Sequence, residues 1–584
     1  MEIMKLESLA NELILELFEF FNAIQLLRAF HGLNFRFDTL LDVHFRDYSL
    51  DFRSVSKRDF DLFCQQQLPS LIDRVTSICL SDDDETPNIS NHFLSYSLTM
   101  NMFTNLRSLA LYGLPYIVIV QKFILDCRNL PCFTHLKVTE CRFEVHAAFI
   151  YFINNVWHLT KLTHCHVENI FEPNIRLVAP KVPSLSIKHL SIMITTCQLN
   201  ALAHLLEKTP NLRRLNVNIT SNGNGDDDKQ MQVVHSTITT LTLLFHPSIE
   251  KMQNLFRIVP NLFHLTINTT SIYLNGHQWK QIIVNQLRKL KIFRFQMTFS
   301  FPDNNTNNNN IEEQIDLLLD TFRTPFWLNE HGWFVRCDWN AQIIDNISLY
   351  TVPYAFDALS IHHSKRSKWT CPNDNNYWSY NYVKNFWYEN DLFQDLNLFP
   401  AHFPNIHHLR LRLPVNDNFW FVIPTLHNLI SLNLSLRQSR TITQINALFD
   451  LIPNVYSLTI EPSLFSRIAT LKTINKSIRR LNLFDLSGSY FDSVQCSLLA
   501  DSLLGCQCEV LIIGVEHRTN AYFLITHMPN LRVLIFRCRD DKWHENRSSS
   551  TRDELLSWLK NRLSSTCSIS KNVKAPFKIR VWIG

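Results

Sequence analysis

The chain has 584 residues, of which 46% are apolar, and its 56 Lys and Arg outweigh its 52 Asp and Glu by only four charges. This charge is too small to indicate nucleic acid or an anionic membrane as a partner. Glycine, at 10 residues, is far below its usual share of about 7%, and no glycine-rich phosphate-binding motif occurs. The length allows several domains or one array of stacked repeats.

The first predicted element is a helical segment over residues 6–37. Ser8 is expected to cap its first helix, with Glu12 in the first turn. Residues 13–21 hold more apolar side chains than the single stripe of a surface helix requires. One stripe can pack against a second predicted helix at 24–30. The excess then needs a partner protein or the first structural repeat to cover it.

This segment resembles an F-box, the helical motif that docks a substrate receptor onto the adaptor of a cullin-RING ubiquitin ligase. The family pattern falls on Leu9-Ala10, Glu12-Leu13-Ile14, Leu17-Phe18, Phe20-Phe21 and Leu26-Leu27. Ala10 stands where the family has Pro, and Phe37 takes the place of the usual Trp. The resemblance implies that the leftover apolar surface binds the adaptor. The expected contacts are Leu9, Ile14, Phe18, Phe21 and Leu27.

A short pattern, Pro-Asn-Leu-x-x-Leu-x-apolar, then recurs along the chain. Copies begin at Pro210, Pro260, Pro404, Pro453 and Pro529, with looser ones at Asn105, Pro131 and Asn428. The pattern predicts a helix end, a turn whose Asn accepts left-handed backbone, and a strand. The predicted strand centres are Ile78, Leu109, Leu136, Leu162, Leu190, Leu215, Leu241, Leu265 and Leu290, then Leu409, Leu432, Leu458, Leu481, Leu511 and Leu534.

Helical segments lie between these strands, for example at 199–206 and 445–452. No such helix buries its apolar stripe alone, so stacked units must supply the partner. One strand and one helix per unit resemble the leucine-rich repeat family. The resemblance implies an α/β, right-handed horseshoe solenoid with a parallel concave sheet and convex helices, preceded by a small all-α F-box-like domain. The family's ladder position after the strand holds Thr220, Thr270, Ser463 and Cys141, which are expected to ladder weakly.

Strand side chains alternate between two faces, which predicts one buried and one polar face. The residues expected to be buried are Leu212, Leu215, Val217, Leu262, Leu265, Ile267, Leu458, Ile460, Leu531 and Leu534. The target-binding candidates on the polar face are Arg410, Arg412, Arg480, Arg214 and His408. The first three are predicted to form one basic patch for an acidic or phosphorylated target. The alternative is an ordinary solvated face.

The repeat rhythm breaks between the two runs. Residues 303–310 are Asn-rich and predict a mobile loop, followed by a helix at 311–322. Six of the 12 Trp lie in the segment 326–393 that follows. Strand-like pieces at 333–337 and 358–361 predict atypical repeats. The segment is either an aromatic core or an insertion for protein recognition.

Motifs for catalysis or metal binding are absent from the sequence. The 14 cysteines include no C-x-x-C pair, and the His and Cys residues between 127 and 166 fit no zinc pattern and are expected to be structural. No nucleophile elbow occurs. Acidic runs at 82–85 and 226–228 predict solvated loops. We therefore expect no enzyme, no metal and no cofactor.

These features predict a non-enzymatic substrate receptor with an F-box-like domain at 1–45, repeats at 46–300, an irregular segment at 301–400, repeats at 401–545 and a cap at 546–584. The expected partners are the ligase adaptor, the cullin scaffold and a protein target, without nucleic acid or membrane, and the chain is expected to be a monomer within that complex. Free thiols and the lack of a signal peptide predict a cytoplasmic or nuclear location. The alternative is a free-standing repeat scaffold or ligand sensor whose N-terminal helices only cap the repeats.

Overall fold

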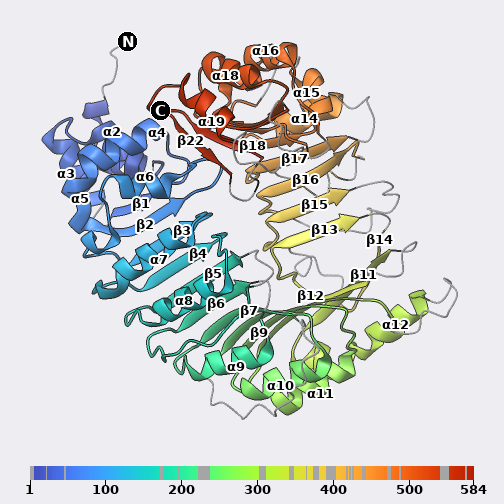
Figure 1. Ribbon diagram of the computed structural model, residues 1–584. Helices are drawn as coiled ribbons and strands as arrows, with labels where there is room; N and C mark the ends of the chain where they lie inside the picture. Colours follow the sequence, from blue (N-terminus) through green and yellow to red (C-terminus); the bar gives the residue numbers. More distant parts are fainter. Residues whose placement is uncertain are drawn as a thin grey trace. The chain divides into compact units, whose positions relative to one another are not determined.

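Short parallel strands joined by helices make up most of the chain in the computed structural model (Figure 1). The fold is mixed α/β, with two large and mostly parallel sheets. The structure describes residues 6–21, 23–44, 48–170, 175–194, 197–220, 237–301, 311–340, 347–362, 365–371, 380–389, 403–415, 419, 423, 426–436, 442–469, 475–485, 488–539, 552–572, 575 and 577–584. The predicted loops at 226–228 and 303–310, and Trp378, lie outside these residues.

The chain divides into two units. Unit 1 comprises Met1–Cys197, His204–Leu212 and Trp558–Gly584, and unit 2 comprises Gln198–Ala203 and Arg213–Ser557. Within each unit the parallel strands pair in chain order, so among them the order of the sequence is also the order of neighbours in the sheet. Within each unit, a residue on one strand therefore has partners about one repeat earlier and one repeat later.

Unit 1 begins with helices α1 (Asn11–Phe18), α2 (Ala23–Phe30) and α3 (Phe35–His44). The ring of Phe30 lies between those of Phe18 and Phe37, with centroids 5.0 and 5.2 Å away. Helix α2 also packs against the first strand, β1. Ser8 does not cap α1 as predicted, because it ends a 3-10 turn over Leu6–Ser8 and α1 begins with Ala10 at the N-cap.

The six strands of unit 1 that follow are parallel. They are β1 (Tyr48–Asp51), β2 (Val75–Ser81), β3 (Ser108–Tyr112), β4 (His135–Thr139), β5 (His164–Ile170) and β6 (His189–Ile194). Helices α7 (Ile117–Asp126) and α8 (His146–Trp157) lie along one side of them (Figure 1). The register aligns Leu136 with Cys165 and not with the predicted Leu162. The prediction chose the wrong residue because β5 carries Cys where other strands carry Leu.

Unit 2 opens with four parallel strands. They are β7 (Arg214–Ile219), β8 (Thr240–Phe245), β9 (His264–Thr270) and β10 (Ile292–Phe299). Phe293 aligns with Leu265, so the predicted centre at Leu290 is also wrong. The helices here are α10 (Ile249–Ile258), α11 (Gly276–Gln286) and α12 (Ile311–Thr321), and the last confirms the helix predicted at 311–322.

The pairing becomes antiparallel after β10. Strand β10 pairs with β12 (Ile347–Val352), β12 with β11 (Phe334–Asn340), and β11 with β14 (Lys365–Trp369). The strand predicted at 333–337 is present, but it belongs to this antiparallel group and not to a parallel repeat. The repeat rhythm of the sequence breaks at this point because the strand direction alternates here.

The second sheet of unit 2 is parallel throughout. Its strands are β13 (Ala358–His362), β15 (Asn385–Glu389), β16 (His408–Leu413), β17 (Ser431–Leu436), β18 (Ser457–Ile460), β19 (Arg480–Asn482), β20 (Val510–Val515) and β21 (Val533–Cys538). The register aligns all six centres predicted from Leu409 to Leu534. All ten residues that the repeat pattern predicted to be buried are at most 6% exposed.

Helices lie between the strands of both sheets. They include α9 (Leu199–Glu207), α14 (Ile442–Leu451), α15 (Pro462–Ile468), α16 (Ser493–Asp501) and α18 (Arg518–His527). The helices predicted at 199–206 and 445–452 are thereby confirmed. In Figure 1, α14 and α15 lie beside the ends of β17 and β18 and leave the opposite face of these strands to other contacts.

Several repeat turns carry hydrogen bonds between successive units. In four Pro-Asn turns and in the looser copies at Asn105 and Asn428, the Asn Nδ2 donates to a main-chain carbonyl about one repeat earlier. The pairs are Asn105–Asp73 at 2.6 Å, Asn211–Leu185 at 2.7 Å, Asn405–Asn381 at 2.9 Å, Asn428–Pro404 at 3.0 Å, Asn454–His427 at 2.8 Å and Asn530–Cys506 at 2.7 Å. None of these six asparagines has a positive φ, so the predicted left-handed turn is wrong. The turn uses Asn for its amide donor.

The C-terminal strands pack against the beginning of unit 1. Strands β22 (Ser568–Lys571) and β23 (Ile579–Trp582) form an antiparallel pair. The buried Trp582 ring lies 5.8 Å from that of Phe60 and 6.0 Å from that of His92, measured between centroids. This contact joins the last strand of the chain to helices α4 (Lys57–Leu62) and α6 (Ile89–Ser95).

A polar contact completes this C-terminal junction. Arg580 Nη1 donates to the carbonyls of Asp82 at 2.9 Å and Asp83 at 3.3 Å, 498 residues away in the first case. The Asp82 carboxylate accepts from the Ser90 N–H at 2.9 Å. Burial raises the pKa of Asp82 to about 6. Asp82 and Glu85 of the acidic run are therefore buried at this junction, whereas Asp83 is exposed, so the solvated loop that the charges predicted is only partly present.

Candidate functional site

Large apolar side chains remain exposed around α1–α3. They are between 41% and 87% exposed, and we call them the N-terminal apolar surface: Leu6, Leu13, Phe20, Phe21, Leu33, Phe35 and Val43. Phe20 and Phe35 are the most exposed, at 83% and 87%. Phe20 follows the end of α1 and Phe35 begins α3, so these two aromatics lie near opposite ends of the helices. Large exposed apolar side chains of this kind are candidates for a protein contact. The excess of apolar residues noted in the sequence therefore reaches the surface here.

Three of the five predicted adaptor contacts lie in the core. Ile14, Phe18 and Leu27 are fully buried among α1–α3, so a partner cannot reach them while these helices are packed. Only Leu9 and Phe21 of the predicted set remain accessible. The prediction assigned the two stripes of α1 the wrong way round: residues four apart in a helix share a face, and the face of Ile14 and Phe18 is the one that packs.

Hydrogen bonds hold these helices in place. Arg36 of α3 donates from Nε to Asn11 Oδ1 at 2.8 Å and also to the carbonyls of Leu9 and Glu7. The Asp38 carboxylate accepts from the Gly32 N–H at 2.9 Å. The first of these contacts joins the start of α1 to the start of α3, and the second fixes the turn between α2 and α3. The exposed side chains are thus presented by ordered backbone, which lowers the entropy cost of binding.

The target-binding candidates of unit 2 centre on β16. Arg410 and Arg412 alternate along this strand with the buried Leu409 and Leu411, so they share the opposite face. The register places Trp387 of β15 beside Arg410. Trp387 is 43% exposed. The sequence offered the Trp-rich segment and the β16 arginines as separate target sites. They lie side by side here, and we call Trp387, Arg410 and Arg412 the Trp387–Arg410 surface.

The single basic patch predicted for Arg410, Arg412 and Arg480 is not formed. Strands β17 and β18 separate β16 from β19, so at about 4.8 Å per strand the main chains lie about 14 Å apart. Arg480 shares a register row with His408. Burial lowers the pKa of His408. Arg214 lies on β7, in the other sheet of unit 2.

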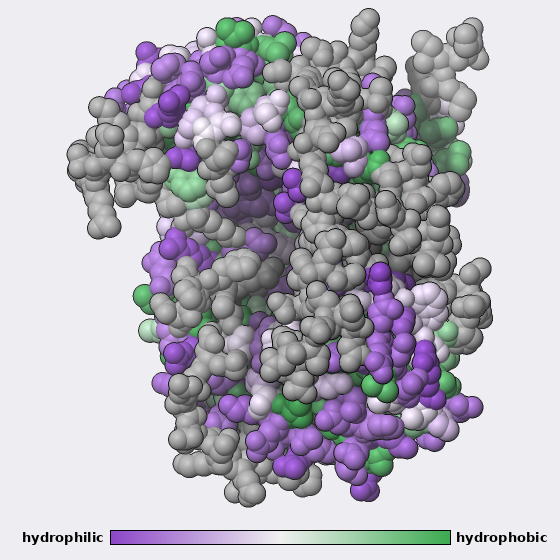
Figure 2. All heavy atoms as spheres, turned by 90° about the vertical axis from the view of Figure 1, so that its right-hand side faces the viewer, coloured by the Kyte–Doolittle hydropathy of each residue, from purple (hydrophilic) through white to green (hydrophobic). Residues whose placement is uncertain are grey.

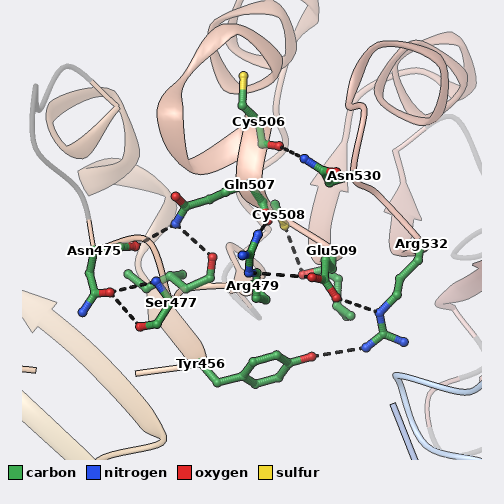
Figure 3. A network of polar contacts seen from close by, with 12 residues as sticks. Tyr456, Asn475, Ser477, Arg479, Cys506, Gln507, Cys508, Glu509, Asn530 and Arg532 are labelled. Atoms are coloured by element: carbon green, nitrogen blue, oxygen red, sulfur yellow. Dashed lines mark hydrogen bonds and ion pairs between the residues drawn. The ribbon is translucent and has the colours of Figure 1, made fainter. Parts of the chain in front are cut away.

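Charged residues at the starts of β18–β21 pair with one another (Figure 3). Glu509 accepts from Arg532 at 3.2 Å and lies 3.7 Å from the Arg479 guanidinium. Arg532 also donates to the Tyr456 hydroxyl at 3.2 Å. These contacts offset cationic charge next to Arg480, which makes this edge less suited to an acidic target than β16.

Most of the described Trp-rich segment is core. Trp327, Trp333 and Trp339 are at most 9% exposed. Beside them lies a buried ion pair, in which Arg336 Nε donates to Asp338 Oδ1 at 2.7 Å. The aromatic-core interpretation is confirmed for these three tryptophans. Among the described tryptophans of the segment, the recognition hypothesis is left with the exposed Trp387 and the half-buried Trp369.

Several cysteine thiols among the described residues are deeply buried. No group of His, Cys, Asp and Glu among the described residues could hold a metal ion. Burial raises the pKa of the Cys165, Cys197 and Cys508 thiols to about 12. Thiols of this kind are poor nucleophiles at neutral pH. Over the same residues, none of the helices combines the length and the apolar character needed to cross a bilayer.

The outer surface is largely polar where it can be seen. Figure 2 shows one face of the molecule, on which hydrophilic side chains predominate among the described residues and apolar ones form small groups. The N-terminal apolar surface and the Trp387–Arg410 surface are therefore the two candidate interaction sites that follow from the predicted residues.

No protein-family profile matches the sequence, and no curated protein matches it either.

Proposed function

We propose that the chain is a non-enzymatic substrate receptor of a cullin-RING ubiquitin ligase. In this proposal α1–α3 act as an F-box-like adaptor-binding segment, and the strand–helix units form a leucine-rich-repeat-like solenoid that presents a target. The observation that carries the proposal is the N-terminal apolar surface: aromatic side chains on ordered helices, directly ahead of parallel strand–helix units. A fold alone does not define a function, so the argument depends on this surface.

The size of this surface fits a specific protein contact. Burying an exposed Phe contributes about 1.5–3 kcal/mol. Phe20 and Phe35 together would supply about 3–6 kcal/mol, and Leu13, Leu33 and Val43 would add to this. Micromolar binding requires about 8 kcal/mol after the costs of association. The N-terminal apolar surface would therefore supply part of this free energy, and further contacts with the adaptor would have to supply the rest.

The test is calorimetric binding of the purified ligase adaptor to the full chain. The double variant Phe20→Ser/Phe35→Ser is expected to weaken binding by at least about 30-fold, since hot-spot residues contribute about 2 kcal/mol or more. Its melting temperature should stay native, because both side chains are exposed. The matched control is Val118→Ser, which removes a 70% exposed side chain from α7. Native-like binding by the double variant, or no binding by the native chain, would refute the proposal.

One observation favours the alternative of a free-standing repeat scaffold. Helix α2 packs against β1, as a cap on the first repeat would. Removing residues 1–45 should then lower the melting temperature of unit 1, while the native chain binds no adaptor. A receptor binds the adaptor and a cap does not, so titration of the native chain with the adaptor separates the two functions.

The Trp387–Arg410 surface is the proposed target site of unit 2. The double variant Arg410→Glu/Arg412→Glu reverses two charges beside Trp387 without changing a buried residue. It is expected to reduce ubiquitin transfer to captured targets in a reconstituted ligase, with adaptor affinity unchanged. Unchanged transfer would exclude this surface as the target site.

A further inference from the structure

Three imidazole rings form a stack on the strand face of unit 1. We call it the imidazole stack: His135 of β4, His164 of β5 and His189 of β6. Neighbouring ring centroids are 4.1 and 4.2 Å apart, with interplanar angles of 13° and 8°. The register pairs these residues directly, and the strand spacing of about 4.8 Å brings their rings into contact. In the sequence, this stack corresponds to a His at the same position of three successive repeats. A search for the short spacings of zinc ligands does not detect that pattern.

Threonine hydroxyls contact two of the three rings. Thr163 Oγ1 lies 3.1 Å from the Thr134 carbonyl and 2.8 Å from His164 Nδ1. Thr134 Oγ1 lies 3.3 Å from the Arg107 carbonyl and 2.8 Å from His135 Nδ1. Both threonines contact Nδ1, so a ligand at the stack would meet these rings at Nε2.

Fixed charges on this strand face cancel. The face carries two cations and two anions: Arg53, Lys137, Asp51 and Glu168. Arg53 pairs with Asp51 at 2.5 Å, and Glu168 accepts from His166 at 2.7 Å. The hydrogen bond from His166 lowers the pKa of Glu168. When the imidazoles are neutral, the described fixed charges of this face sum to zero. Protonation of its histidines therefore makes the face positively charged.

Further cations lie near the imidazole stack, and one of them, Lys137, also interacts with the Glu168 carboxylate of β5. Arg107, Lys161 and Lys188 are exposed in the segments that lead into β3, β5 and β6. Lys137 lies on β4, two residues beyond His135 on the same face, with its Nζ 5.1 Å from the centroid of the Tyr112 ring. An anion at the stack would therefore be attracted from several sides.

Repulsion keeps neighbouring rings from ionising together without a counter-ion. Two unit charges about 4 Å apart repel by about 1 kcal/mol in water and about 4 kcal/mol at a protein surface. A carboxylate beside the Nε2 edges offsets this repulsion. Anion binding and proton uptake at the stack are consequently linked, and each favours the other.

We propose that the imidazole stack and Lys137 form a docking site for an acidic segment of a partner protein, rich in Asp and Glu. Its carboxylates accept hydrogen bonds from the protonated Nε2–H groups. The parallel rings do not converge on one point as metal ligands would, and a row of carboxylates matches a row of rings. The inference extends the proposed function, because the segment would belong to a target. Its test uses the purified chain alone, so its failure leaves adaptor docking unaffected.

The experiment is fluorescence anisotropy with a labelled peptide of alternating Glu and Ser, at pH 6.0 and 7.5 and constant ionic strength. Binding of the carboxylates favours proton uptake at the stack, so Kd should be lower at pH 6.0 than at pH 7.5. The peptide with Gln in place of Glu should not bind.

Variants locate the effect. The triple variant His135→Asn/His164→Asn/His189→Asn should remove the pH dependence, and Lys137→Ala should weaken binding at both pH values. The matched control is His277→Phe, at an exposed histidine of α11 in unit 2, which should bind as the native chain does. If the triple variant does not fold, His164→Phe, which keeps a flat ring in the stack, should reduce the pH dependence.

Several outcomes overturn this proposal. Equal binding of the Glu and Gln peptides, or binding independent of pH, excludes carboxylate recognition by the stack. Native binding by the triple variant, or by His164→Phe where that is the folded form, moves the site elsewhere. Binding that requires Zn²⁺ and is lost with EDTA would make the stack a metal site. Binding of a phosphopeptide without binding of the Glu peptide would exclude an Asp- and Glu-rich segment as the ligand.

Discussion

Replacing Trp582 with Ala is expected to release the C-terminal strand from the start of unit 1. The indole is fully buried, contacts the rings of Phe60 and His92, and has Lys57 Nζ 5.9 Å from its centroid. Emptying a core site of this size costs about 3–5 kcal/mol. Aromatic contacts account for about 0.5–1.5 kcal/mol each within that figure. The loss should fall on the junction because the side chain touches both of its parts.

Arg580→Met tests the polar half of the same junction. The guanidinium is 4% exposed and donates to the carbonyls of Asp82 and Asp83. Burial lowers its pKa, so its charge is held in place by these partners. Removing one side of a buried charged contact costs about 3–5 kcal/mol. The two substitutions lie two residues apart on β23, so their effects should not add fully.

Hydrogen exchange measured by mass spectrometry reports this loss locally. Each 1.4 kcal/mol lowers protection about tenfold, so Trp582→Ala should accelerate exchange by a hundredfold to about a thousandfold or more. Exchange should accelerate in both segments, 577–584 and 81–90, because each shields the other from solvent. Trp387→Ala, which removes an exposed indole from unit 2, serves as the control and should leave both peptides protected. Loss of protection in 577–584 alone would refute the mutual contact.

Three further predictions follow from the packing. Asn454→Ala should lower the free energy of unfolding by about 1 kcal/mol in urea titrations, because the His427 carbonyl loses its donor; no change would mean that the Pro-Asn ladder contributes nothing. Phe18→Ala should cost about 3–5 kcal/mol, while Phe20→Ser leaves the melting temperature nearly native; the reverse order would contradict the assignment of core and surface. Burial raises the pKa of Asp82 to about 6, so its contribution to stability is complete below about pH 4 and is lost as the pH rises through 6, by roughly 3 kcal/mol. Asp82→Asn should lack this decline, and identical pH profiles would show that Asp82 is not the cause.

The repeat units could be predicted because strand geometry acts on every copy alike. Alternation forces an apolar residue at fixed positions, so the spacing of Leu432, Leu458 and Leu481 gave the correct register. The two errors, at Leu162 and Leu290, arose where the strand centre is Cys165 or Phe293. A search for apolar character, without a preference for Leu, would have found both.

The functional residues were harder to predict because they depend on contacts between distant segments. An overloaded helix such as α1 does not reveal which stripe is buried until α2 and α3 are placed, so Phe18 was mistaken for a surface residue. Asp82 has the local composition of a loop, and its partner Arg580 is 498 residues away. The sequence indicates a contact between distant residues only when they occupy the same position in neighbouring repeats, as His164 and His189 do.

The junction between Asp82 and Arg580 has a consequence for synthesis of the chain. A ribosome adds about 5–20 residues per second, so the 498 residues between the two take about 25–100 s to make. During this time Phe60 and the pocket for Trp582 lack their cover, because β23, the strand that closes them, has not yet been made. The packing of unit 1 is therefore completed only once β23 has been translated, and chains truncated before it would keep that apolar surface open to chaperones and proteases.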